Sequence, residues 1–230
     1  TENNKVNKLL CGKIKEGVSK YSLELWNTNS REVLYPQRFY EIFDPDYIPG
    51  TIPEDKTTSY KIMDEGLLVK REISGAKEYA SFVYDLIAGL CIAKAAIFNN
   101  SKNEENITSL KNTAIWERIN NSEIEKNHPL SEDIIKSIIF LCPKYTGKSI
   151  FEVIHNPTIA KYSSQMIEVV ANDQNRMSLN NFLLSQDVDS EILKYYIESF
   201  VSEIVIFEKY DNLNIVKTLL LKMSITELNT

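Results

Sequence analysis

The stretch that most resembles a catalytic motif is CPKYTGKSIF, residues 142–151. A P-loop needs a strand, then GxxxxGK[ST], then a helix, because the glycine backbone cradles phosphates, the lysine reaches the β and γ groups and the hydroxyl binds magnesium. The end of that pattern is matched by Gly147, Lys148 and Ser149. Residues 138–142 could supply the strand, and residues 204–208, IVIFE, imitate a Walker B run. However, Cys142 stands where the first glycine is required, so a P-loop-like nucleotide-binding enzyme is an alternative and not the leading interpretation.

Metal and acid–base chemistry have less support still. His128 precedes a proline in a polar loop and His155 ends a predicted helix, and neither has a partner at a usual metal-binding spacing. Asp187 and Asp189 are better explained as helix-start residues than as a catalytic carboxylate pair. We therefore predict no catalytic residue, no cofactor and no metal site.

Composition narrows the class of protein. The chain has 230 residues, of which 43% are hydrophobic, and a net charge of −6 with a pI near 5.2. These values are typical of a globular protein and argue against one whose main role is to neutralise phosphates. Nucleic acid is therefore unsupported as a partner, although a nucleic-acid-associated factor with a local basic face is a second alternative.

The cysteines favour a reducing compartment. Cys11, Cys91 and Cys142 lie in apolar runs and show no CxxC or Cys/His spacing, so we predict reduced, buried thiols. The first ten residues have no apolar core of signal-peptide length. Both observations favour an intracellular location, in the cytoplasm or the nucleus.

The N-terminal third predicts short β-strands. Between Lys8 and Ile73 the apolar spacing is closer to two than to 3.6, as in YSLEL at residues 21–25. The runs 60–63 and 67–73 flank a turn at residues 64–66 and predict a hairpin.

Within this region, prolines alternate with aromatic residues in YPQRFYEIFDPDYIPGTIP, residues 35–53. Proline fixes φ and removes a donor, so this stretch is a rigid connector, with a short helix over residues 37–43 that Pro45 ends. One interpretation is that its rings cover the sheet. The other is a partner-binding loop, because interfaces favour Tyr and Phe. The candidate partner-binding residues are Tyr35, Phe39, Tyr40, Phe43 and Tyr47.

Residues 77–99 are apolar on nearly every side of a helix, which predicts a central buried helix. Asp85 and Lys94 lie inside the run and would be costly in a bilayer, so we reject a membrane span. Small residues such as Gly89 would let neighbouring backbones approach closely.

The remaining chain predicts further helices. One covers residues 108–120, and another starts at Ser131 and covers residues 132–142, with Pro143 ending it. The later predicted helices are 149–155, 158–171, 178–185, 191–210 and 213–223.

These patterns predict an α+β fold. A small N-terminal antiparallel β-sheet in residues 1–74 packs on a predominantly α-helical bundle in residues 75–230, in what is expected to be one compact unit. The leading functional hypothesis is a non-catalytic protein–protein interaction module, a subunit or adaptor of an intracellular complex, with protein partners and no membrane association.

Overall fold

The computed structural model describes residues 2–51, 53–73, 77–98 and 113–147, together with Leu110, Ile150, Ile159, Tyr162 and Leu221. The chain divides into two compact units. The first comprises residues 1–101 and 114–134, and the second comprises residues 102–113 and 135–230. Most of the described residues belong to the first unit.

The first unit is α+β, as predicted, with a three-stranded antiparallel sheet and a helical majority. Its elements, in chain order, are α1 (Glu2–Thr28), β1 (Glu32–Tyr35), α2 (Gln37–Phe43), the 3₁₀ turn η1 (Glu54–Lys56), α3 (Thr58–Asp64), β2 (Leu68–Ile73), β3 (Lys77–Phe82), α4 (Asp85–Ile92), the π-helical turn η2 (Ala93–Phe98), α6 (Ala114–Ile119), the 3₁₀ turn η4 (Ile124–Lys126) and the first turn of α7 (Ser131–Thr146).

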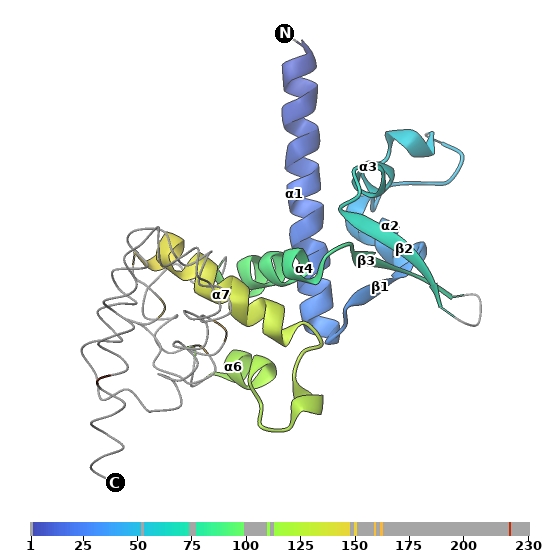
Figure 1. Ribbon diagram of the computed structural model, residues 1–230. Helices are drawn as coiled ribbons and strands as arrows, with labels where there is room; N and C mark the ends of the chain where they lie inside the picture. Colours follow the sequence, from blue (N-terminus) through green and yellow to red (C-terminus); the bar gives the residue numbers. More distant parts are fainter. Residues whose placement is uncertain are drawn as a thin grey trace. The chain divides into compact units, whose positions relative to one another are not determined.

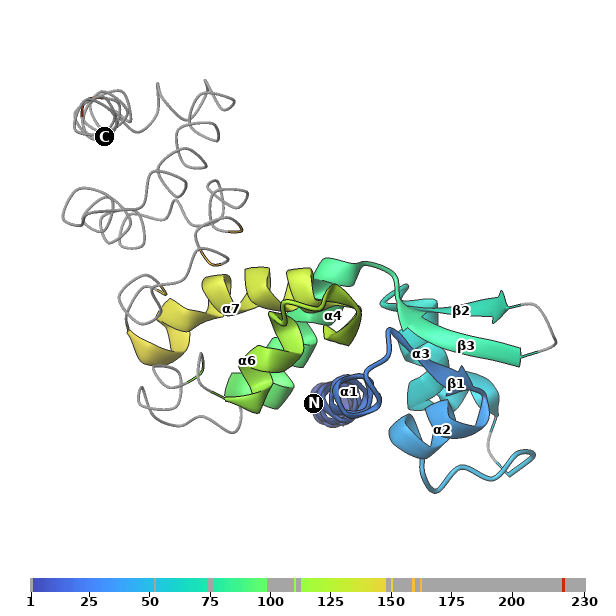
Figure 2. The ribbon, with the colours of Figure 1, turned by 90° about the horizontal axis from the view of Figure 1, so that it is seen from below.

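The longest element, α1, replaces the strands predicted from residue 8 onward, so that prediction was wrong. Tyr21 and Leu25 lie one helical turn apart and are both fully buried, and Gly17 lies one turn earlier on the same face. The alternation of apolar and polar residues in 21–25 is a coincidence over five residues, within a helix whose buried face follows the 3.6-residue period. Figure 2 shows α1 nearly end-on, with α4 on one side and α2 and the sheet on the other.

The sheet has the order β1–β3–β2, with both neighbouring pairs antiparallel (Figure 1). Its central strand, β3, is the first part of the run predicted as a helix over residues 77–99, so that part of the prediction was wrong. The last three residues of β3, Ala80, Ser81 and Phe82, are all buried, which removes the alternation that usually marks a strand. The inner face of the sheet is formed by Val33, Leu68, Ala80 and Phe82.

The predicted hairpin at residues 60–73 is correct only in its second half. Residues 68–73 form β2, but residues 58–64 form α3, whose N-cap Thr57 accepts a hydrogen bond from the Tyr60 N–H at 3.1 Å. Gly66 has φ +68°, and the chain turns there from α3 into β2. The hairpin partner of β2 is therefore the later strand β3.

Helix α4 and the turn η2 confirm that residues 85–98 are helical and mostly buried. Ile92, Ala93 and Ile97 are at most 1% exposed. Two large residues at the start of α4 are exposed, Tyr84 at 65% and Leu86 at 51%, so the run is not enclosed on every side as predicted. Within the part of the chain that the structure describes, none of the helices combines the length and hydrophobicity that crossing a bilayer requires.

Helix α2 occupies residues 37–43 as predicted, and α6 buries Trp116 and Ile119 as the helical spacing indicated. Helix α7 begins at Ser131 with two acids in its first turn, also as predicted. It continues through Pro143 to Thr146, so the prediction that Pro143 ends it was wrong. The helix ends at Gly147, whose φ is +73°. The later predicted helices, from residue 149 onward, lie outside the described residues except for four single positions.

Candidate protein-interaction site

The connector of residues 35–53 has an inner side that belongs to the core. Helix α2 directs Phe39 and Phe43 toward α1, and they are 0% and 6% exposed. Their ring centroids lie 4.8 Å apart, and both rings contact Tyr21 of α1, at 6.0 and 5.7 Å. Tyr21 in turn donates a hydrogen bond to the Ala80 carbonyl of β3. This aromatic contact ties α2, α1 and the sheet together.

The outer side of the connector carries a tyrosine pair. Tyr40 and Tyr47 are stacked, with centroids 5.1 Å apart and an interplanar angle of 22°, and both are half-buried. The Tyr40 hydroxyl donates to a Glu54 carboxylate oxygen at 2.8 Å. Partial burial is the main cause that raises the pKa of Tyr40, and this hydrogen bond is the second. Both rings are therefore held in place before any ligand arrives.

Asp44 fastens the connector to α3. Its carboxylate accepts hydrogen bonds from the backbone N–H groups of Thr58 and Ser59, at 2.8 and 2.7 Å, and from the Ser59 hydroxyl. These N–H groups belong to the first turn of α3, which has no intrahelical acceptor for them. An acidic side chain there also complements the helix dipole. The Asp44 carboxylate therefore holds the two ends of the loop between α2 and α3 together, in addition to the restriction that the prolines impose.

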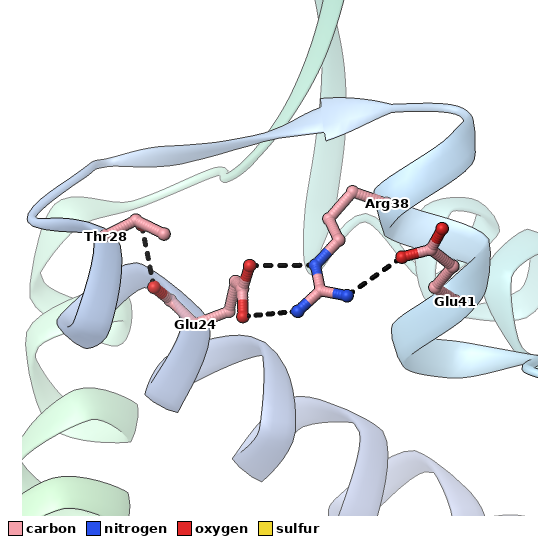
Figure 3. Close-up of polar contacts among 4 residues, drawn as sticks. All are labelled: Glu24, Thr28, Arg38 and Glu41. Carbon is pink, nitrogen blue, oxygen red and sulfur yellow. Dashed lines mark hydrogen bonds and ion pairs between the residues drawn. The ribbon is translucent and has the colours of Figure 1, made fainter.

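Arg38 fastens α2 to α1 (Figure 3). Its Nε and Nη2 donate to the two carboxylate oxygens of Glu24 at 2.8 and 2.7 Å, and its Nη1 donates to Glu41 at 2.8 Å. The hydrogen bonds from Arg38 lower the pKa of Glu24, and the two carboxylates raise the pKa of Arg38. A planar guanidinium fits a carboxylate in this two-bond geometry, which limits the rotation of α2 on α1.

A groove of about 350 Å³ lies between α1 and the connector, and Tyr47 forms part of its wall. Its apolar floor comes from Leu10, Gly17, Ile42 and Phe43. Charges of both signs line the rim: Lys13, Lys20 and Lys56 are positive, and Glu16, Asp44 and Asp46 are negative. Lys20 is paired with Glu16 at 2.8 Å, and Asp44 is occupied by α3. The groove thus combines a few apolar residues with a larger number of charged ones of both signs.

No known protein family, curated protein or solved structure matches the chain.

The five predicted partner-binding residues separate into two groups. Phe39 and Phe43 are core residues, packed against Tyr21 of α1. Tyr35, Tyr40 and Tyr47 are half-buried and partly accessible. Of these, only Tyr47 lines the groove in the described part of the chain.

The other candidate motif does not have the surroundings that its chemistry needs. Residues 138–142, required as a strand before a P-loop, lie inside helix α7, and Gly147 ends that helix. Lys148, Ser149 and the Walker-B-like residues 204–208 lie outside the described residues. A P-loop depends on the turn from a strand into a helix, so the match in residues 142–149 is one of sequence only.

The remaining polar candidates have structural surroundings where they are described. His128 is 1% exposed, its Nε2 donates to the Leu25 carbonyl and its Nδ1 accepts the Leu130 N–H, both at 3.1 Å. His155, Asp187 and Asp189 lie outside the described residues. No cluster of potential metal ligands occurs among the residues that the structure describes.

All three cysteines are free, but their burial differs from the prediction. Cys142 is buried and Cys91 is half-buried, whereas Cys11 is exposed, so the prediction of three buried thiols was wrong at that position. Cys11 lies on the solvent side of α1, whereas the adjacent Leu10 is half-buried and lines the groove.

The five groove residues of α1 were missed because residues 8–25 were assigned to strands; they are Leu10, Lys13, Glu16, Gly17 and Lys20. Lys13 and Gly17 line the groove only when α1 is a helix, since a helix places residues four apart on one face. The signal that could have revealed this face is the helical spacing of Leu10, Ile14, Gly17, Tyr21 and Leu25.

Proposed function

We propose that the protein is a non-catalytic interaction module, a subunit or adaptor that holds a segment of another protein in the groove beside Tyr47. The observation that carries the proposal is the tyrosine pair: Tyr47 stacks on Tyr40, whose hydroxyl is fixed by Glu54, at the wall of the groove. Rigid aromatic side chains lose little conformational entropy on binding, which is why they are frequent hot spots.

The shape and charge of the groove suggest what it binds. About 350 Å³ with a floor of aliphatic and aromatic carbon suits one or two apolar side chains of a partner segment. The rim balances lysines against acids, so it favours a polar segment of mixed charge over a strongly charged polymer such as nucleic acid. The free cysteines are compatible with a partner met in the cytoplasm or nucleus.

The test compares the wild type with Tyr47→Ala in affinity purification from cells, followed by binding measurements with the recovered partner. We expect Tyr47→Ala to weaken binding by about 2 kcal/mol, roughly thirtyfold, while the variant stays folded. The matched control is Tyr60→Ala, because Tyr60 is 42% exposed on α3 and does not line the groove.

Each outcome of this test decides the proposal. Loss of the partner with Tyr47→Ala and retention with Tyr60→Ala support it. Equal affinity of both variants for every recovered partner contradicts it. A wild-type protein that recovers no partner specifically also contradicts it.

A further inference from the structure

A second cavity lies at the end of the sheet where β1 begins and β3 leads into α4. Its volume of about 650 Å³ falls within the range of small-molecule sites, roughly 300–1,000 Å³. It shares no lining residue with the groove beside Tyr47. Its charged and hydroxyl-bearing side chains include Arg31, Glu32, Arg71, Ser81 and Asp85.

The strand register places three of these residues on one face of the sheet. Ser81 of β3 pairs with Glu32 of β1 on one side and with Val69 of β2 on the other. Arg71 follows Val69 by two residues and therefore shares its face. The residues on either side of Ser81, Ala80 and Phe82, point to the opposite face, where they contact Tyr21. Glu32, Ser81 and Arg71 thus form a polar row on the face away from the aromatic core.

The fold alone does not explain why the Ser81 hydroxyl is buried without a hydrogen-bond partner. Ser81 is 6% exposed, and its Oγ is the one buried side-chain polar atom without a hydrogen-bond partner in the described part of the chain. Buried hydroxyl groups normally have a partner, because losing the bonds to water is costly. Since Ser81 lines the cavity, a ligand there can supply the missing partner.

The charges around the cavity are balanced, and half of them are already paired. Arg31 forms an ion pair with Asp85 of α4. Arg71 and Glu32 form no ion pair among the described residues. A lone anion would meet Glu32 and Asp85, and a lone cation would meet both arginines. A ligand that carries both charges avoids this repulsion.

We infer that this cavity binds a small zwitterion, namely a free amino acid or a dipeptide. The Arg71 guanidinium and the Ser81 hydroxyl hold its carboxylate, and Glu32 holds its ammonium group. A guanidinium matches a carboxylate with two parallel hydrogen bonds, and the hydroxyl adds a third donor. The two charged residues lie on the strands flanking β3, two strand spacings apart across the sheet and two residues apart along it, or roughly 12 Å in all. Their long side chains can converge on a ligand above Ser81.

The experiment is calorimetric titration of the full chain with the twenty free amino acids and with alanyl-alanine, with acetate and methylammonium as single-charge controls. We expect at least one zwitterion to bind with a dissociation constant below about 1 mM, and both single-charge probes to bind at least about tenfold more weakly. Arg71→Ala should weaken the zwitterion about tenfold or more. Lys70→Ala removes a neighbouring positive charge from the other face of β2 and should leave the affinity unchanged.

Ser81→Ala distinguishes a ligand group from a structural one. The hydroxyl makes no hydrogen bond in the free protein and its burial is costly, so the urea midpoint of Ser81→Ala should equal or exceed that of the wild type while zwitterion affinity falls about fivefold. Glu32→Gln should weaken the zwitterion and strengthen acetate, because one repelling charge is removed. Absence of binding by every zwitterion overturns the inference, and so does equal binding of acetate or unchanged affinity in both Arg71→Ala and Ser81→Ala.

Discussion

Helix α1 has two kinds of neighbour on its two sides. On the side of α2 and the sheet its contacts are apolar, because Tyr21 packs against three phenylalanines. The single polar atom in this contact is the tyrosine hydroxyl, which donates a hydrogen bond to a β3 carbonyl. On the other side, Trp26 stacks on His128 with a centroid distance of 5.6 Å and an interplanar angle of 22°. The Arg118 guanidinium covers the same indole ring at 4.7 Å.

The two sides should therefore respond differently to change. The first side, which we call the aromatic side, is stabilised by buried area and close packing, so its energy depends on volume and hardly on pH. The second, the histidine side, depends on two hydrogen bonds to one ring and on that ring staying neutral. We expect volume changes to dominate on one side and protonation on the other.

The largest effect is expected for Phe39→Ala on the aromatic side. The ring is fully buried between Tyr21 and Phe43, so its removal leaves a cavity and should cost about 3–5 kcal/mol in the free energy of unfolding. Urea denaturation measures the loss. Tyr47→Ala, on the outer side of the same connector, should cost about 1 kcal/mol or less. Equal losses of unfolding free energy in Phe39→Ala and Tyr47→Ala would contradict the division of the connector into a core side and a surface side.

The next effect concerns packing near the histidine side. A Cβ on Gly89 of α4 would lie 2.5 Å from the carbonyl carbon of Asp133 and 2.6 Å from its oxygen. Backbone cannot rotate away, so Gly89→Ala should cost about 1–3 kcal/mol. The matched control is Gly12→Ala in α1, which meets nothing within 4 Å and should stabilise the helix by about 0.5–1 kcal/mol. The same sign for both variants would contradict this packing.

The third effect is a pH dependence that belongs to His128. Burial of the ring lowers its pKa from the usual 6.5, with Arg118 as a smaller cause. Around and below pH 6.5 the histidine is protonated in the unfolded chain but still neutral in the folded chain. The free energy of unfolding should therefore fall as pH decreases from about 7.5, until the folded pKa is reached. Each unit of pKa shift removes about 1.4 kcal/mol.

Urea midpoints measured between about pH 7.5 and 5 test this dependence. His128→Gln should be less stable at the upper end of that range and should lose most of the slope across it. Phe39→Leu, a change confined to the aromatic side, should keep the wild-type slope, since no group that titrates there is altered. A wild-type slope in His128→Gln would contradict the assignment of the pH dependence to the histidine side.

The sequence predicted the starts of two helices marked by a proline or a capping residue, but it missed α3 despite its cap Thr57, and it missed elements decided by tertiary contact. Helix α2 is bracketed by Pro36 and Pro45, and α7 starts with a serine followed by two acids, so both were predicted at their observed starts. Strand β3 has no such residues at its ends, and its last three residues, Ala80, Ser81 and Phe82, are all buried, so no alternation marks it as a strand. Helix α1 was missed because five residues happen to alternate.

The candidate site was predicted in part. Proline and tyrosine spacing identified the connector, since those residues constrain the backbone directly. The division between inward phenylalanines and outward tyrosines depends on the position of Gly17, which makes room for the Phe43 ring. That contact joins residues distant in sequence, and no local pattern encodes it. The polar row of Glu32, Ser81 and Arg71 likewise arises only from strand register.

The smallest effect is expected for the ion pair that fastens α2 to α1 at the surface of the aromatic side. Arg38 is 46% exposed, so solvent screens its two-bond contact with Glu24, and Arg38→Met should cost about 1 kcal/mol or less at neutral pH. The hydrogen bond from Arg38 lowers the folded pKa of Glu24 below 4.5. The contribution of the pair is therefore present above about pH 4.5 and is lost as pH falls through the folded pKa.

Urea midpoints of the wild type and Arg38→Met should accordingly differ at neutral pH and converge as the pH falls below the folded pKa of Glu24. Lys20→Met is the matched control, since it breaks an exposed pair with Glu16 on the same helix and should change the midpoint less than Arg38→Met at neutral pH. If Arg38→Met cost as much as Phe39→Ala, the aromatic side would depend on charge as strongly as on volume. The contrast between the two sides of α1 would then fail. A small difference in urea midpoint that disappears in acid and in high salt would mean that the Arg38–Glu24 pair only aligns α2 on α1. The stability of α2 on α1 would then come from Phe39 and Phe43.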